Sequence, residues 1–213
     1  WLIDSHIACV NRCRRFHFKN VIHADFLSWN PNMNFDVVIG NPPYGSGASL
    51  AVKFLNKSFE LADEIYFVLP GSIEKPSLLN RVDTGFDTVH NEKLPNDTFP
   101  RNIQAVYQHW SKTATPRQKI KTLRTHPDLK FVSREEANVG IGRVGNGSAG
   151  YVMLEKFSHL SPNSNYFLKV SDATIDRLKQ MQPEFIAATL ENFNSNPSLS
   201  KHQLISIYES FFS

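Results

Sequence analysis

The stretch Phe35–Gly45, FDVVIGNPPYG, limits the possible folds of this chain more than any other. An apolar run ends at Gly40, and an asparagine, two prolines and Tyr44 follow it. Adjacent prolines remove two backbone donors and fix two φ angles. The pattern predicts a strand over Phe35–Gly40 that is covered on both faces, as in a parallel sheet, and a rigid loop directly after it.

Segments typical of strands and helices alternate along the first half of the chain. Such alternation is typical of an α/β fold with a mostly parallel, doubly wound sheet. The expected helices are His6–Phe16 and Leu50–Ala62, and the other expected strands are residues 1–4, Asn20–Phe26, Glu64–Pro70, 86–94 and 103–110.

The composition changes after Lys112, so we divide the chain into residues 1–112 and 113–213. The segment Lys112–Phe131 is basic, and a glycine-rich stretch follows at Gly140–Gly150. A basic run of this kind is either a solvated surface or a contact with nucleic-acid phosphates. Two further helices are expected, at Ser171–Met181 and at 198–212. The sequence therefore predicts a small α+β appendage for residues 113–213.

Composition excludes several classes of protein. The formal charge of +3 is mild, and no apolar run approaches the roughly 20 residues of a membrane helix. The two cysteines, Cys9 and Cys13, indicate a reducing compartment rather than a disulfide framework. They lie one helical turn apart near two histidines, but tetrahedral zinc sites usually draw on two separated pairs, so we expect no metal site. We expect a cytoplasmic protein without a membrane partner.

The loop after Gly40 carries groups that suit one kind of ligand. In an open parallel sheet, ligands bind beyond the carboxyl ends of the strands. The Asn41 side chain and the Pro42 carbonyl are hydrogen-bond acceptors there, and Tyr44 adds a flat aromatic face. These groups favour a planar heterocycle or amide that bears an NH2 group. The alternative is a plain strand-ending turn.

The same loop resembles the catalytic motif of S-adenosylmethionine-dependent amino methyltransferases. Other segments resemble the gamma-class (TaqI-type) DNA adenine N6-methyltransferases in the same order: WLID at 1–4, HADFLSW at 23–29, EIYFVLPGS at 64–72 and LPNDTFPRNIQAVYQHW at 94–110. The resemblance covers residues 1–112. It implies a Rossmann-like methyltransferase sheet that is N-terminally incomplete, with a small C-terminal α+β appendage.

The resemblance implies roles for three cofactor-binding residues. Asp4 would hydrogen-bond the ribose hydroxyls of S-adenosylmethionine. Asp25 would accept a hydrogen bond from the adenine amino group of the cofactor, and Phe26 would pack on that ring. From the residues alone, Asp4 could equally cap a helix and Asp25 could be a surface acid. The glycine-rich cofactor loop of the family lies before the strand that matches WLID, so we expect an upstream segment or a partner chain to supply it.

The resemblance also implies which residues would act on the target. Asn41 and the Pro42 carbonyl would accept the two hydrogens of the target amine beside the cofactor, with Pro43 keeping the loop rigid. Tyr44 and Phe99 would stack on the two faces of the target base. Phe99 could instead be an aromatic residue of the core.

These roles predict methyl transfer to the exocyclic amine of adenine in double-stranded DNA, as in bacterial or phage restriction-modification. The base would be flipped out of the duplex, and transfer would be direct and in line. Lys119, Lys121 and Arg124 would contact phosphates. The alternatives are a methyltransferase that acts on RNA or on a protein glutamine, and a non-catalytic DNA-binding subunit of a split methyltransferase.

Overall fold

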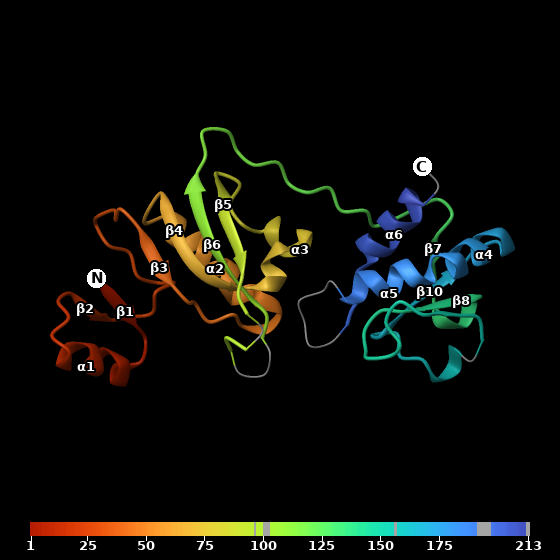
Figure 1. Ribbon diagram of the computed structural model, residues 1–213, viewed down its shortest axis with the longest axis horizontal. Helices are drawn as coiled ribbons and strands as arrows, with labels where there is room; N and C mark the ends of the chain where they lie inside the picture. The colour runs from red at the N-terminus through yellow and green to blue at the C-terminus, as the bar shows by residue number, and fades with distance from the viewer. Residues whose placement is uncertain (96, 100–102, 156, 191–196, 212–213) are drawn as a thin grey trace. The chain divides into compact units, whose positions relative to one another are not determined.

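The computed structural model describes residues 1–95, 97–99, 103–155, 157–190 and 197–211 (Figure 1). The chain forms two compact units: Trp1–Leu94 with Ala105–Lys119, and Pro95–Gln104 with Ile120–Ser213. The division therefore falls after Lys119 rather than after Lys112, and the segment Pro95–Gln104 counts with the second unit. Each unit has a hydrophobic core of its own.

The first unit has the α/β architecture that the sequence predicts. Its strands are β1 (Leu2–Asp4), β2 (Val21–His23), β3 (Val38–Gly40), β4 (Glu64–Pro70), β5 (Phe86–Lys93) and β6 (Ala105–Lys112). Its α-helices are α1 (Ile7–Arg15), α2 (Ser49–Phe59) and the single turn α3 (Pro76–Leu79).

The strands of the first unit form two separate sheets. β1 and β2 pair in parallel as a two-stranded sheet. The other sheet has the order β3-β4-β6-β5, in which only β3 and β4 are parallel. The prediction of a mostly parallel sheet is therefore wrong for this sheet as a whole, because β5 and β6 form an antiparallel hairpin. The parallel pair of this sheet, β3 with β4, is the part that leads into the Asn-Pro-Pro-Tyr loop.

The strand before that loop differs from the prediction in length and in burial. β3 covers only Val38–Gly40, and the side chain of Ile39 is 76% exposed. β3 pairs only with β4, and the core lies on one face of the sheet. The prediction of a strand covered on both faces is therefore wrong here. An apolar run predicts burial only where a second layer is present, and none of the described residues supplies one over Ile39.

The core of the first unit lies between α2 and the larger sheet. The apolar face of α2 presents Val52 and Leu55 to strand residues such as Ile65 and Trp110, all of them at most 2% exposed. Each such side chain contributes roughly 1.5–3 kcal/mol by leaving water. This packing fixes α2 on β4, and Gly45 and the short 3-10 helix η1 (Ser46–Ala48) connect the Asn-Pro-Pro-Tyr loop to α2.

The second unit has α+β architecture, as the sequence predicts for the C-terminal part. Its antiparallel sheet has the order β7-β10-β8-β9, and helices accompany it. The strands are β7 (Lys130–Phe131), β8 (Val139–Gly142), β9 (Val152–Met153) and β10 (Asn165–Lys169), and the helices are α4 (Asp172–Gln180), α5 (Gln182–Leu190) and α6 (Lys201–Ser210).

The glycine-rich stretch Gly140–Gly150 connects β8 to β9 in a tight turn. A Cβ atom on Gly142 would lie 1.7 Å from the Ser148 carbonyl oxygen, so only glycine fits there. Gly150 has a φ of +85° and would place a Cβ 2.8 Å from backbone atoms of α5. Close approach of backbone to backbone therefore explains these glycines without a ligand.

Two further expectations concern membranes and metals. No helix in the described part of the chain is long and apolar enough to cross a membrane. The described residues also contain no group of three or more histidine, cysteine or acidic side chains that could hold a metal ion.

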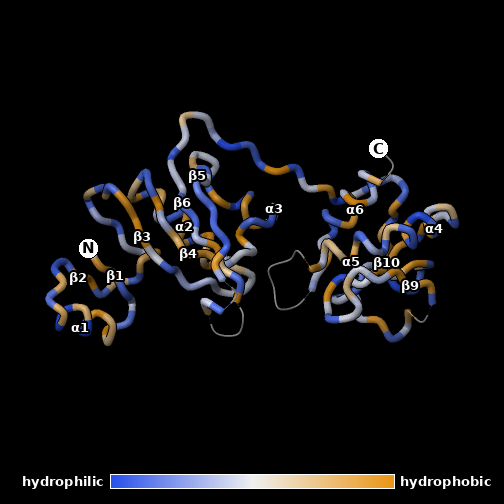
Figure 2. The backbone as a smooth tube through the Cα atoms, viewed as in Figure 1, coloured by the Kyte–Doolittle hydropathy of each residue, from blue (hydrophilic) through white to orange (hydrophobic). Residues whose placement is uncertain are grey.

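Figure 2 draws residues 112–121, which lead out of the first unit, as mostly hydrophilic.

Candidate functional site

The predicted site residues of the first unit lie at the ends of three strands. β1 ends at Asp4, and β3 ends at Gly40, directly before Asn41. Asp25 follows β2 by two residues. Because these strands run in parallel pairs, their carboxyl ends are where a ligand is expected.

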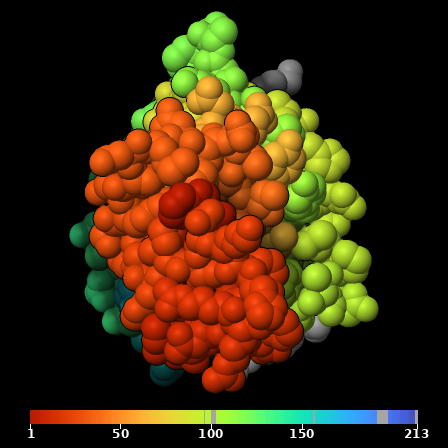
Figure 3. All heavy atoms as spheres, turned by 90° about the vertical axis from the view of Figure 1, so that its left-hand side faces the viewer, coloured from red at the N-terminus to blue at the C-terminus, as the bar shows by residue number. Residues whose placement is uncertain are grey.

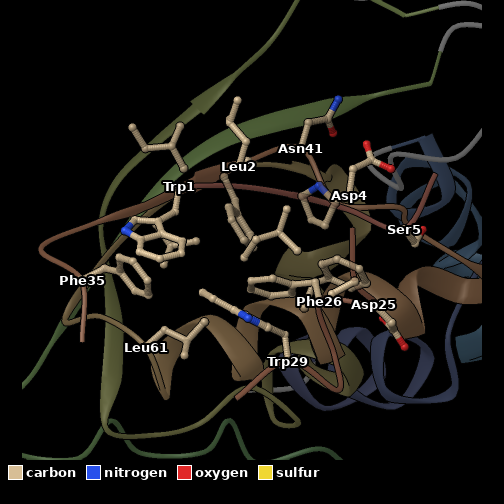
Figure 4. A pocket seen from close by; sticks show the side chains of 18 of the residues that line it. Trp1, Leu2, Asp4, Ser5, Asp25, Phe26, Trp29, Phe35, Asn41 and Leu61 are labelled. Atoms are coloured by element: carbon tan, nitrogen blue, oxygen red, sulfur yellow. The ribbon is translucent and has the colours of Figure 1, made fainter. Parts of the chain in front are cut away.

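A pocket of about 380 Å³ lies between β1 and β3 and gathers these residues (Figure 4). This volume falls within the usual range of ligand pockets, roughly 300–1,000 Å³. Figure 4 shows polar side chains at one end of the pocket and large apolar ones at the other. The predicted residues among its lining are Asp4, Asp25, Phe26, Asn41, Pro42 and Pro43.

Both acids at the polar end, Asp4 and Asp25, also accept hydrogen bonds from nearby backbone N–H groups. One Asp4 carboxylate oxygen accepts a hydrogen bond from the backbone N–H of His6 at 2.6 Å, and one Asp25 oxygen accepts from the N–H of Leu27 at 3.1 Å. In each carboxylate the second oxygen has no hydrogen-bond partner among the described residues. The local capping role and the predicted ligand role are thus compatible for both acids.

The aromatic side chains of the pocket form its apolar end and floor. Phe26 stacks on Phe54 of α2, with ring centroids 5.2 Å apart. Phe35 lies between Trp1 and Trp29, at centroid distances of 6.2 and 5.8 Å. The roles of Trp1, Trp29 and Phe35 in the pocket were missed at the level of sequence, although all three lie in stretches that carry the resemblance.

Figure 3 shows the outer surface beside this pocket. The first residues of the chain, in the darkest red, lie between the rest of the red N-terminal segment and the orange segment that leads into β3. The side chains of Trp1 and Ile39 are 56% and 76% exposed. The pocket is therefore bordered by exposed apolar groups as well as by polar ones.

Asn41 differs from the acids because nothing in the described fold uses its side chain. The residue is exposed, and no hydrogen bond joins its amide to any described residue. Pro42 is buried directly behind it. A fixed φ angle and a buried ring limit the motion of this segment, so the backbone beside Asn41 is restrained, and the side-chain oxygen of Asn41 stays available to a ligand.

The backbone of the next residues anchors the loop to α2. The Tyr44 carbonyl accepts hydrogen bonds from the N–H groups of Leu50 and Ala51, at 3.1 and 3.2 Å. Gly45 makes this turn possible, because its φ is +69° and a Cβ there would lie 2.7 Å from the Leu50 Cβ. Two N–H groups at the start of the helix, which would otherwise lack partners, are thereby satisfied.

The Tyr44 side chain packs against the core of the first unit. Its hydroxyl is buried and has no hydrogen-bond partner among the described residues, and this burial raises the pKa of the phenol. Tyr44 is not among the residues that line the pocket. Its predicted stacking on a target base therefore stays a prediction.

The other predicted target-binding residues do not fall in one unit. Phe99 is half-buried in the segment that counts with the second unit, and Pro100 lies outside the described residues. Lys119 ends the first unit and lines a separate pocket beside Asp83, whereas Lys121 and Arg124 are exposed in the second. Their joint action on one DNA molecule stays a prediction.

Comparison with known proteins supports a methyltransferase. The sequence profile of the Eco57I restriction-modification methylase family matches residues 6–70, about a third of the chain. That match includes Asp25, Phe26 and the whole Asn41–Tyr44 loop, and it excludes Asp4. No curated protein gives a significant sequence match.

Two solved structures show limited likeness. One is described as a putative RNA methyltransferase from Pyrococcus horikoshii, with 20% identity, a TM-score of 0.38 and coverage of 52% of this chain and 61% of that one. The other is the 23S rRNA methyltransferase ErmE, with 10% identity, a TM-score of 0.39 and coverage of 99% and 81%. The chain thus spans less than two thirds of the first structure. At such scores we base nothing further on either likeness.

The pocket fits the adenosine part of S-adenosylmethionine, the cofactor that the family match implies. The free carboxylate oxygens of Asp4 and Asp25 are acceptors, and the Phe26 ring offers an apolar surface. Gly40 is the only glycine among the described residues that line the pocket. Among the described residues, no glycine-rich loop therefore lines the pocket.

Proposed function

We propose that this chain carries the catalytic loop of an S-adenosylmethionine-dependent DNA methyltransferase that modifies the exocyclic amine of adenine. One observation carries the proposal: three strand ends bring Asp4, Asp25 and Asn41 to a single pocket, and of these only Asn41 has no task in the described fold. The match of residues 6–70 to a restriction-modification methylase family supports it independently.

The chemistry of Asn41 follows from its environment. The lone pair of an aromatic amine is delocalised into the ring, so the amine is a poor nucleophile. An acceptor on each N–H favours a pyramidal nitrogen whose lone pair is available for attack. Asn41 and the Pro42 carbonyl are the two acceptors, and the rigid loop holds them in place before the reaction, which is electrostatic preorganisation.

The residues at the other strand ends would hold the cofactor. Asp4 would accept from the ribose hydroxyls and Asp25 from the adenine amine, each through the oxygen that the backbone does not use. Phe26, fixed by its stacking on Phe54, would pack against the adenine ring. When bound, S-adenosylmethionine supplies an electrophilic methyl group for direct transfer.

Adenine in DNA is the proposed acceptor because the family match is to restriction-modification enzymes and the loop resembles that of adenine N6-methyltransferases. A base inside a duplex cannot reach a pocket at a strand end, so the base would be extruded. Tyr44, at the end of the loop that bears Asn41, is the residue that we propose would contact the extruded base.

The test has two stages. Calorimetric titration of the 213-residue chain with S-adenosylmethionine measures cofactor binding first, and saturable micromolar binding is expected. Methyl transfer is then compared among duplex DNA, RNA and a glutamine-containing peptide, with the methylated product identified by mass spectrometry. N6-methyladenine formed from DNA supports the proposal. Methylation of RNA or peptide alone would overturn the DNA assignment, and no cofactor binding by folded protein would overturn the function of this chain alone.

A further inference from the structure

The second unit contains a surface cluster of three cations and two aromatic rings. We call it the cation–aromatic cluster and define it by Arg124, Arg143 and Lys201 with Phe131 and Tyr166. Phe131 lies on β7, Tyr166 on β10 and Lys201 at the first position of α6, elements that Figure 1 labels. Only Arg124 figured among the phosphate contacts expected from the sequence.

The cluster is continuous from one cation to the next. The Lys201 Nζ lies 3.6 Å from the centre of the Phe131 ring. Phe131 meets Tyr166 edge to face, with centroids 5.8 Å apart, and the Arg143 guanidinium lies 5.7 Å from the centre of the Tyr166 ring. Contacts between cations and rings are attractive, but they neutralise no charge.

No carboxylate compensates these charges within the described residues. The acids of the second unit that form ion pairs do so with other arginines, Glu135 with Arg134 and Asp128 with Arg177. Burial lowers the pKa of the Lys201 ammonium, and the nearby positive charge of Arg124 lowers it further. The backbone N–H of Leu123, the neighbour of Arg124, donates to the imidazole of His202, the neighbour of Lys201, at 3.0 Å. Arg124 and Lys201 therefore belong to segments that lie side by side.

The cluster is rigidly supported by backbone hydrogen bonds. The Tyr166 hydroxyl donates to the Leu199 carbonyl at 3.1 Å, and the Leu199 N–H donates to the Arg143 carbonyl at 2.8 Å. Ser200 and Gln203 form a capping box at the start of α6. Arg143 and Lys201 therefore project from well-supported backbone and from a capped helix, and their arrangement needs little ordering on binding.

We propose that the cation–aromatic cluster binds the phosphate backbone of duplex DNA, an inference that rests on the proposed function. Charge complementarity carries it: no ion pair joins any of the three cations to an acid among the described residues, and a phosphate would offer them a negatively charged partner. The rings already bear cations on their faces, so they are not free to stack on bases. The contact is therefore with the backbone and independent of sequence.

Another pair of like charges in the same unit provides the matched control. Lys130 and Lys169 are directly opposed across β7 and β10. Both are exposed, and neither ammonium lies over a ring in the described structure. Phe131 follows Lys130 on β7, so successive side chains place this pair on the other face of the sheet. Neutralising it changes the net charge of the second unit by the same amount.

The experiment measures the salt dependence of duplex DNA binding by the full chain without cofactor. Fluorescence anisotropy with a labelled duplex compares wild type, R124Q/K201Q and K130Q/K169Q between roughly 50 and 200 mM salt, where phosphate contacts respond strongly. The slope of log K against log salt should become shallower by about 2 in R124Q/K201Q. It should stay unchanged in K130Q/K169Q. Equal slope changes in both variants, or none in R124Q/K201Q, would overturn the proposal.

Two additions keep the result interpretable. Because the first variant removes a repulsion, its melting temperature should not fall. If it does not fold, R143Q alone should make the slope shallower by about 1, and an unchanged slope there overturns the proposal. Duplex RNA is measured in parallel, and preferential binding of RNA through the same residues would overturn the assignment to DNA.

The outcome is separable from that of the proposed function. Binding is measured without S-adenosylmethionine and requires no methyl transfer. A slope that depends on the cluster in a protein that forms no N6-methyladenine would support the surface and reject the enzymatic role. Normal methylation with a slope insensitive to the cluster would do the reverse.

Discussion

The loops that follow β2 and β3 both border the pocket, yet they divide the work of folding differently. After β2, side chains hold the loop: Asp25 accepts from the Leu27 N–H, and Phe26 stacks on Phe54. After β3, the backbone does so: Pro42 is buried, and the Tyr44 carbonyl binds the start of α2. The side chain of Asn41 is left out of both arrangements.

This difference separates a residue whose side chain has no task in the described fold from residues whose side chains help to hold it. A side chain without folding tasks can be removed at little cost in stability, so its loss reports on function alone. A side chain that also caps a turn confounds the two effects. The difference predicts that substitutions after β3 and after β2 will separate activity from stability to different degrees.

The largest effect is expected from Asn41→Ala. Methyl transfer should fall by roughly 100-fold or more, as on removal of one preorganised hydrogen-bonding group. Cofactor affinity and melting temperature should change little, because Asn41 is exposed and unbonded among the described residues. Single-turnover transfer rates and thermal unfolding measure the two quantities. Asn34→Ala, an exposed asparagine before the same strand, is the control, and equal losses in both variants would contradict the role of Asn41.

A comparison of two glycines tests the backbone support of the loop after β3. Gly45→Ala should lower the free energy of unfolding by ~2–4 kcal/mol, because a positive φ and a close approach to Leu50 act together. Gly47 has a φ of +56°, but a Cβ there would meet no atom within 4 Å, so Gly47→Ala should cost only about 1 kcal/mol. Denaturant unfolding measures both, and equal costs would mean that contact with Leu50 is unimportant.

Asp25→Asn tests the double task of the loop after β2. The asparagine oxygen can still accept from the Leu27 N–H, so stability should hold, while the negative charge is lost. Cofactor affinity should weaken about tenfold, the low end for a hydrogen bond to a charged group. Calorimetry with Asp25→Asn and Asp25→Ala checks this. Only the alanine variant should also lose stability, and unchanged affinity in both would remove Asp25 from the cofactor site.

The smallest effect should come from Tyr44→Phe, and it should be stabilising. The Tyr44 hydroxyl is buried without a partner among the described residues, so its removal should raise the free energy of unfolding by about 1 kcal/mol. Tyr208→Phe is the opposite case, because the Tyr208 hydroxyl donates to Asp128 at 3.0 Å. That variant should be less stable than wild type. Destabilisation by Tyr44→Phe would show that its hydroxyl has a partner in solution.

Local patterns predicted most strands and helices of the first unit, and α4 and α6 of the second. Hydrophobic periodicity located α1 and α2, and Ser171 caps α4 through the Thr174 N–H. The β5–β6 hairpin and the polar residues Asp4 and Asp25 were indicated by the family resemblance, and α5 and the strands of the second unit were missed. The Asn41–Tyr44 loop follows a parallel strand, as expected. Two adjacent prolines after an apolar run fix two φ angles, so the end of the strand could be predicted there.

Long-range features could not be predicted in the same way. The exposure of Ile39 depends on whether a second layer covers β3, which no pattern within the strand encodes. Trp1 meets Phe35 only when the start of the chain packs against the connection between β2 and β3, which also carries Trp29. The cation–aromatic cluster likewise joins residues from Arg124 to Lys201. Single-sequence reasoning detects periodicity, and these contacts have none.

The separation of the two sheets in the first unit has a mechanical consequence. In the described structure, no backbone hydrogen bond joins residues 1–30 to the β3-β4-β6-β5 sheet. Ring contacts and the hydrogen bond from Lys57 to Asn30 join these two parts of the unit instead. Such contacts tolerate small displacements that a strand ladder would resist. We therefore expect the distance between the two sides of the pocket to change more readily than distances within either sheet, and hydrogen exchange in β1 and β2 with and without S-adenosylmethionine would test this.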